Sequence, residues 1–107
     1  HKRIIDYVED SCRTFANIVD NFITGEVYNV GGKVEWEMDI KQYSDLVLEA
    51  TGKNDKLVNY EAAEPFTTKI KTVDFTKAIK DLNHNPIIAP DEGIKRTVKW
   101  MKKNYNL

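Results

Sequence analysis

Apolar residues recur every three or four positions along the first part of the chain, which is the spacing of one face of an α-helix. Asp10 and Ser11 can each cap the start of this helix, and Gly25 can end it in a left-handed turn. The pattern predicts that this face is buried and that Cys12 is a small apolar residue on it, not a nucleophile. The face consists of Cys12, Phe15, Ala16, Val19, Phe22 and Ile23.

The same spacing predicts three more helices farther along the chain. Asp39 is placed to cap the first of them and Gly52 to end it. Asp74 can cap the second, and Pro90 with Asp91 begins the third. Their inward positions are Ile40, Tyr43, Leu46, Val47 and Ala50, then Phe75, Ala78, Ile79 and Leu82, and finally Ile94, Val98, Met101 and Tyr105.

Four short stretches between the helices are rich in β-branched and aromatic residues, which favour extended strands. They cover residues 26–30, 34–36, 57–60 and 69–73, and we expect the first of them to be largely buried. Strands that alternate with helices indicate an α/β fold, here with a small sheet.

Composition narrows the class of protein. A chain of 107 residues has room for one hydrophobic core, so we expect a single domain over residues 1–107. Its 16 Lys and Arg nearly balance its 17 Asp and Glu, and the net charge of −1 argues against a protein that binds nucleic acid. No apolar run approaches the roughly 20 residues that cross a bilayer, which argues against a membrane protein.

Cysteine and histidine usage points to the compartment and to the chemistry. Cys12 is the only cysteine, so an internal disulfide is impossible and a reducing, cytoplasmic setting is expected. The only histidines are His1, which is terminal, and His84, which we expect in a turn before Pro86, so neither a metal centre nor a Cys–His pair is supported. The sequence opens on His1 without an initiator Met or a secretory signal, and we expect it to be part of a longer polypeptide.

Two groups of cations are candidates for binding an anion. Arg3 precedes a helix start, where a guanidinium can reach an anionic group with two parallel hydrogen bonds. The last predicted helix carries a basic cluster, which we interpret as solvated surface because cations are favoured near a helix C-terminus. Trp100 lies off the apolar face of that helix and either flanks the core or faces a partner. The basic cluster consists of Lys95, Arg96, Lys99, Lys102 and Lys103.

Four motifs resemble one enzyme family. RIIDYVED at residues 3–10 and GEVYNVGG at residues 25–32 closely resemble a stretch of the extended short-chain dehydrogenase/reductases that modify nucleotide sugars. These are the nucleotide-sugar 4,6-dehydratases, epimerases and decarboxylases. DFTKA at residues 74–78 and DEGI at residues 91–94 look like the C-terminal helices of the same family, and the four motifs occur in the family's order.

The resemblance implies a parent enzyme of roughly three hundred residues, in which an N-terminal Rossmann domain holds NAD(P) and a smaller C-terminal part holds a nucleoside-diphosphate sugar. This chain resembles the C-terminal part. Neither the family's glycine-rich loop nor its catalytic Tyr-x-x-x-Lys occurs in the 107 residues. We therefore expect a fragment that is inactive alone, with no catalytic residue, bound cofactor or metal of its own. The expected partners are the sugar nucleotide, the Rossmann domain and a second copy.

The resemblance also implies substrate-binding residues. Arg3 matches the family's arginine that binds the substrate's pyrophosphate. A second arginine of the family falls at Glu64, whose carboxylate would repel a pyrophosphate. Either Lys69 or Lys71 supplies the missing charge, or the substrate lies differently.

A rival interpretation is a free-standing, non-catalytic α/β binding module that keeps the core of the family without its catalysis. The enzyme interpretation predicts that the segment at residues 26–30 is in a position to pair with the Rossmann sheet. A glycine-rich loop and a Tyr-x-x-x-Lys encoded upstream of His1 would decide for the enzyme.

Overall fold

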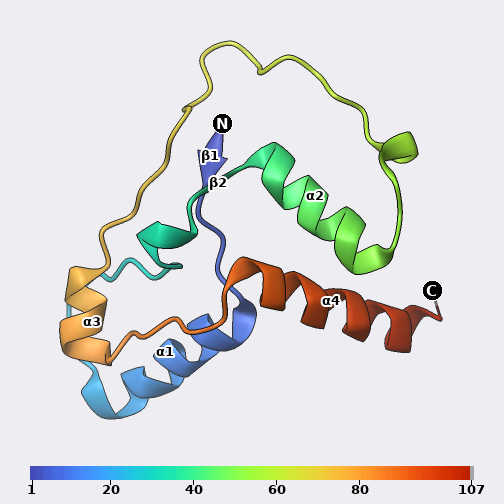
Figure 1. Ribbon diagram of the computed structural model, residues 1–107. Helices are drawn as coiled ribbons and strands as arrows, with labels where there is room; N and C mark the ends of the chain where they lie inside the picture. Colours follow the sequence, from blue (N-terminus) through green and yellow to red (C-terminus); the bar gives the residue numbers. More distant parts are fainter. Residues whose placement is uncertain (107) are drawn as a thin grey trace.

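The computed structural model describes residues 1–106, which form four α-helices and a sheet of two very short strands (Figure 1). Helices α1 and α3 pack together, and α2 packs along α4. The expected α/β class is confirmed. The elements in chain order are β1 (Lys2–Arg3), α1 (Val8–Asn21), β2 (Met38–Asp39), α2 (Ile40–Thr51), α3 (Thr76–Leu82) and α4 (Pro90–Tyr105), with short 3₁₀ turns at Val34–Trp36 and Asp55–Leu57.

The sheet joins the start of the chain to its middle. Strand β1 runs antiparallel to β2, with Lys2 opposite Asp39 and Arg3 opposite Met38. On the other side of β1, the Lys2 N–H donates to the Lys69 carbonyl at 2.7 Å, and Lys2 forms a single parallel bridge with Ile70. The start of the chain therefore lies between two segments that are far away in sequence.

Most of the predicted strands are not formed within the described residues. Residues 26–30 and 57–60 are irregular, 34–36 form a 3₁₀ turn, and 69–73 contribute only the bridge at Ile70. A strand requires a neighbour whose backbone groups pair with its own. In residues 1–106 no ladder forms beside 26–30, and Val27, expected to be buried, is 79% exposed.

Side chains hold residues 26–30 against α3 in place of a backbone ladder. The Tyr28 hydroxyl donates to the Asp81 carboxylate at 2.9 Å, and the Asn29 amide donates to the Asp74 carbonyl at 3.2 Å. Lys77 pairs with Glu26 at 2.6 Å. Desolvation and the hydrogen bond to Asp81 raise the pKa of Tyr28 to about 12.

The predicted ends of α2 and the predicted start of α4 are confirmed. Asp39 and Gln42 form a reciprocal capping box at the start of α2, and Gly52 ends α2 with a left-handed φ of +67°. The prediction of Asp74 as the cap of α3 is wrong by one residue, because the N-cap is Phe75. Asp74 still accepts from the Thr76 N–H at 2.9 Å, and hydrogen bonds from Thr76 lower the pKa of Asp74. Pro90 is the first residue of α4. No helix in residues 1–106 is long and apolar enough to cross a membrane.

Helix α1 begins earlier than predicted. It starts at Val8 after Tyr7, so neither Asp10 nor Ser11 is its cap, and it ends at Asn21, four residues before the turn at Gly25. Asp10 lies in the first turn of α1, where its carboxylate is buried and bonded to another part of the chain. This long-range bond is why the prediction of a local cap was wrong.

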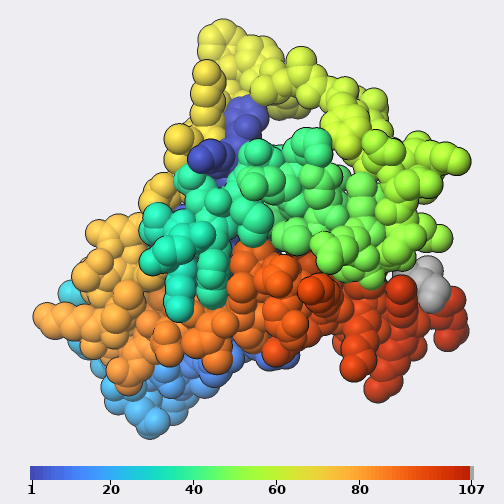
Figure 2. All heavy atoms as spheres, in the orientation of Figure 1, coloured from blue at the N-terminus to red at the C-terminus, as the bar shows by residue number. Residues whose placement is uncertain are grey.

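The core is small for the length of the chain. Its buried apolar side chains include Tyr43, Ala78, Leu82 and Ile88. The radius of gyration is 16.4 Å, whereas compact domains of about 100 residues have roughly 13 Å. The accessible surface is 8135 Å², against about 6,100 Å² for a typical monomer of this mass. Part of the excess comes from the segment between α2 and α3, which stands away from the helices (Figure 2).

Candidate functional site

The inward side of α1 is polar. The two oxygens of the buried Asp10 carboxylate accept from the backbone N–H groups of Ile87 at 3.1 Å and Ile88 at 2.9 Å. Arg13, one turn along the helix, pairs with the same carboxylate. Asn17 donates to the Leu82 carbonyl at 2.9 Å. These bonds join α1 to the segment between α3 and α4, and they leave the Asp10 carboxylate fully partnered.

The outward side of α1 is the apolar face that the sequence predicts to be buried, and that prediction is wrong for this chain. Val19 is 82% exposed, and Cys12 is exposed instead of being packed in a core. Helical spacing identifies an apolar face but not what covers it. This face, called here the α1 apolar face, consists of Cys12, Phe15, Ala16, Val19, Phe22 and Ile23.

His84 lies at the junction of α1, α3 and the loop before β2. It is 2% exposed; its Nδ1 lies 2.7 Å from the Thr14 hydroxyl and its Nε2 lies 2.8 Å from the Gly31 carbonyl. The Phe75 ring meets the imidazole edge-on, with 5.1 Å between ring centroids. His84 was expected only as a residue in a turn, so its place in this junction was missed.

The candidate binding site is a hollow of about 210 Å³ between the start of the chain, the loop before β2 and the segment before α3. Two of its lining residues are the cations Arg3 and Lys71, and the acidic Asp6 also lines it. The hollow is called here the Arg3 hollow. Its remaining lining residues are Ile4, Val30, Gly31, Gly32 and Val73.

The Arg3 guanidinium is partly committed to the fold. One terminal nitrogen donates to the carbonyls of Lys2 at 2.6 Å and Lys69 at 3.3 Å, and the other donates to the Thr68 carbonyl at 3.0 Å. A guanidinium has five N–H donors. Among the described residues, three of these donors have a partner, and two remain for a ligand.

The two lysines proposed as substitutes for the second arginine lie differently. Lys71 lines the Arg3 hollow, whereas Lys69 does not, although its carbonyl is bonded to Lys2 and Arg3. Glu64 is exposed in the segment that stands away from the helices, and it does not line the hollow. The structure therefore brings Arg3 and Lys71 together and separates Glu64 from them.

The Gly31–Gly32 segment forms one wall of the hollow, and at Gly32 it leaves no room for a side chain. A Cβ atom on Gly32 would lie 2.8 Å from the Ile5 carbonyl oxygen and 3.0 Å from Ile4 Cγ2, whereas Gly31 faces open space. The carbonyl of Gly31 is bonded to His84. The segment is thus held between the backbone that follows Arg3 and a buried imidazole.

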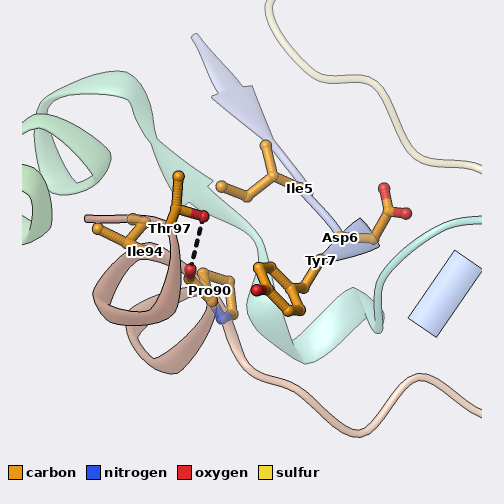
Figure 3. A pocket seen from close by; sticks show the side chains of 7 residues that line it. Ile5, Asp6, Tyr7, Pro90, Ile94 and Thr97 are labelled. Atoms are coloured by element: carbon orange, nitrogen blue, oxygen red, sulfur yellow. Dashed lines mark hydrogen bonds between the residues drawn. The ribbon is translucent and has the colours of Figure 1, made fainter. Parts of the chain in front are cut away.

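A second, smaller hollow lies where α4 packs against the start of the chain (Figure 3). The Tyr7 ring packs on Gly93, where an added Cβ atom would lie 3.1 Å from the ring. Asp6 points away from this contact, toward the other side of the chain. The apolar lining indicates a packing junction and not a polar site. Its lining residues are Ile5, Asp6, Tyr7, Pro90, Gly93, Ile94 and Thr97.

The basic cluster on α4 is exposed, as predicted. Arg96 pairs with Glu92 at 2.7 Å and with Glu9 at 3.0 Å, and the hydrogen bond that Arg96 donates to the Glu92 carboxylate raises the pKa of Arg96. Lys95 lies 4.0 Å from Asp91. Trp100 is half-exposed and meets Tyr105 edge-on at 5.6 Å. Residues 1–106 contain no group of three or more His, Cys, Asp or Glu that could hold a metal ion.

Comparison with known proteins gives one consistent result. The chain is 33% identical over 108 aligned positions to the UDP-glucuronate 4-epimerase of Thermodesulfobacterium geofontis, covering 98% of this chain and 32% of that protein. It is 28% identical over 98 positions to a dTDP-glucose 4,6-dehydratase of an Actinoplanes species, covering 92% of this chain and 30% of that protein. Over nearly its whole length the chain is thus homologous to part of the nucleotide-sugar dehydratases and epimerases of the extended short-chain dehydrogenase/reductase family. No protein-family profile matches it.

The fold of the chain also has a counterpart among solved structures. The crystal structure of UDP-glucuronic acid 4-epimerase from Bacillus cereus, in complex with NAD, superposes with a TM-score of 0.76 and 23% identity. The match covers 98% of this chain and 32% of that one. The chain therefore spans about a third of the length of the family members that it matches.

Proposed function

We propose that this chain is the C-terminal, substrate-binding part of an NAD(P)-dependent nucleotide-sugar dehydratase or epimerase. The observation that carries the proposal is similarity over nearly the whole chain to enzymes of both kinds. In the parent enzyme, a Rossmann domain would hold NAD(P), and the oxidised cofactor would supply the hydride acceptor for transient oxidation at the sugar C4. The chain alone is then inactive and binds no cofactor, and its single cysteine suits the cytoplasm.

The Arg3 hollow is the proposed site for the diphosphate of the sugar nucleotide. Arg3 has two donors left for an anion, and Lys71 supplies a second positive charge in the same hollow. Lys69, two residues before Lys71 in the sequence, adds a further positive charge to this segment of the chain. The Asp6 carboxylate accepts from the Ser11 hydroxyl, so it has a partner of its own.

The α1 apolar face and residues 26–30 are the proposed contact with the Rossmann domain. The accessible surface exceeds that of a typical monomer by roughly 2,000 Å², more than one partner buries in a standard interface, about 800 Å². Residues 26–30 expose Val27 and have backbone groups free of any ladder in the described chain. These features favour a part of a larger enzyme over a free-standing module. A homodimer is the other expected assembly.

The test is the affinity of the full polypeptide for a sugar nucleotide. Arg3→Lys keeps the charge but loses the fork of donors, so we expect affinity to fall by about 1–3 kcal/mol, or roughly five- to 150-fold, with NAD(P) binding retained. The matched control is Lys95→Ala, which removes an exposed cation of α4 and should leave affinity unchanged. Titration with UDP-sugars and dTDP-sugars measures both. Loss of affinity in Lys95→Ala with normal binding by Arg3→Ala would move the site to α4.

A further inference from the structure

We infer that His84 is a positioning residue of the Arg3 hollow, which holds the Gly31–Gly32 wall in place through its Nε2–H. This inference rests on the proposed function of the hollow as a diphosphate site. His84 does not line the hollow itself. His84 acts through the Gly31–Gly32 segment, which does line the hollow, because His84 Nε2 lies 2.8 Å from the Gly31 carbonyl oxygen.

The hydrogen bonds assign the tautomer of His84. The Gly31 carbonyl can only accept, so the proton of this bond belongs to Nε2. The Gly31 N–H lies farther from the same nitrogen, at 3.5 Å. On the opposite side of the ring, the Thr14 hydroxyl lies 2.7 Å from Nδ1 and can donate to it. Both ring nitrogens are therefore satisfied, and the Nε2 side of the imidazole holds the Gly31–Gly32 segment.

Packing leaves the imidazole one position. Phe75 meets the ring edge-on, and the backbone N–H of His84 donates to the Ala78 carbonyl at 3.1 Å at the end of α3. The Gly31–Gly32 segment is confined too, because Gly32 packs against the backbone of Ile5. A shift of His84 would therefore move the Gly31–Gly32 wall relative to Arg3 on the other wall.

Substitutions at His84 can separate its two hydrogen bonds. His84→Gln places an amide nitrogen near the position of Nε2 and can still donate to Gly31. His84→Asn reaches only as far as Nδ1, so it keeps the Thr14 side and loses the Gly31 side. His84→Phe fills the space of the imidazole and loses both hydrogen bonds. Thr14→Val is the matched control, because it removes the partner on the Nδ1 side and leaves the bond to Gly31.

The experiment measures the affinity of the full polypeptide and its variants for uridine diphosphate and thymidine diphosphate, together with their thermal unfolding. We expect His84→Asn and His84→Phe to bind about tenfold more weakly, as loss of one supporting hydrogen bond allows, and His84→Gln to bind within about twofold of the wild type. Thr14→Val should unfold at a lower temperature and bind normally.

Two results would overturn the inference. The first is normal binding by His84→Asn and His84→Phe. The second is a loss of affinity in Thr14→Val as large as in the His84 variants, which would reduce His84 to a structural role. Arg3→Ala, measured in parallel, separates these from failure of the proposed site. If Arg3→Ala loses affinity and the His84 variants do not, only the inference is wrong. If Arg3→Ala binds normally, the diphosphate site lies elsewhere and the inference falls with it.

Discussion

The two sides of α1 differ in a way opposite to most surface helices. The side that carries Asp10, Thr14 and Asn17 is turned inward and bonded to the segment between α3 and α4. The side that carries Phe15 and Val19 is turned outward, with more than half of each side chain exposed. A helix in a self-sufficient domain usually buries its apolar side.

The difference teaches which contacts belong to this chain and which require more protein. Buried polar groups must find partners, and here every partner comes from the chain itself. Apolar surface can stay exposed at a cost in solubility, and a large exposed apolar patch marks an interface. The polar side of α1 is thus a complete internal junction, and the apolar side is an exposed surface that we propose as a contact with another domain.

Breaking the polar side should have the largest effect on stability. Asp10→Ala leaves the part-buried N–H of Ile87 and the buried N–H of Ile88 without an acceptor, so we expect the free energy of unfolding to fall by about 3 kcal/mol. The matched control is Val19→Ala on the apolar side of the same helix, which should change it by less than about 0.5 kcal/mol in this chain. Urea denaturation followed by circular dichroism measures both. Equal losses of unfolding free energy in the two variants would contradict the contrast between the polar and apolar sides of α1.

A smaller effect on stability should appear at high pH. It concerns the contact that holds residues 26–30 to α3. The unfolded chain loses the Tyr28 proton near pH 10.0, whereas the folded chain keeps it up to about pH 12. Between these values the folded state binds more protons, so stability falls as the pH rises. We expect Tyr28→Phe to reduce this fall, and Asp81→Asn, which removes the hydrogen-bonded carboxylate, to act in the same direction. Urea denaturation between pH 10 and pH 12 measures how the free energy of unfolding depends on pH. The same dependence in both variants as in the wild type would contradict the prediction.

The later helices were predictable from the sequence because their signals are local. Asp39 with Gly52 marks both ends of α2, and Pro90 marks the start of α4. The strands were not predictable in the same way, since the segment at residues 26–30 has strand-forming residues but no neighbouring ladder in the described chain. Local propensity cannot supply a partner.

The candidate site was only partly predictable. Arg3 and Lys71 come together in the hollow, but their meeting depends on the pairing of β1 with Ile70, which spans most of the chain. The roles of Asp10 and His84 also rest on long-range bonds. One sequence signal was available for the polar junction, because Asp10, Thr14 and Asn17 themselves recur at helical spacing.

The most direct test uses Cys12, the only cysteine in these 107 residues, as a probe of the α1 apolar face, with labelling read at Cys12 itself. Its rate of labelling by a thiol reagent is compared in the 107-residue chain, at a concentration where sedimentation shows a monomer, and in the full polypeptide. We predict that the isolated chain is labelled within about tenfold of the rate in denaturant, and that the full polypeptide is labelled at least about a hundredfold more slowly because its other domain covers the face. Equal rates in the two proteins would contradict the claim that this face is an interface with the rest of the enzyme.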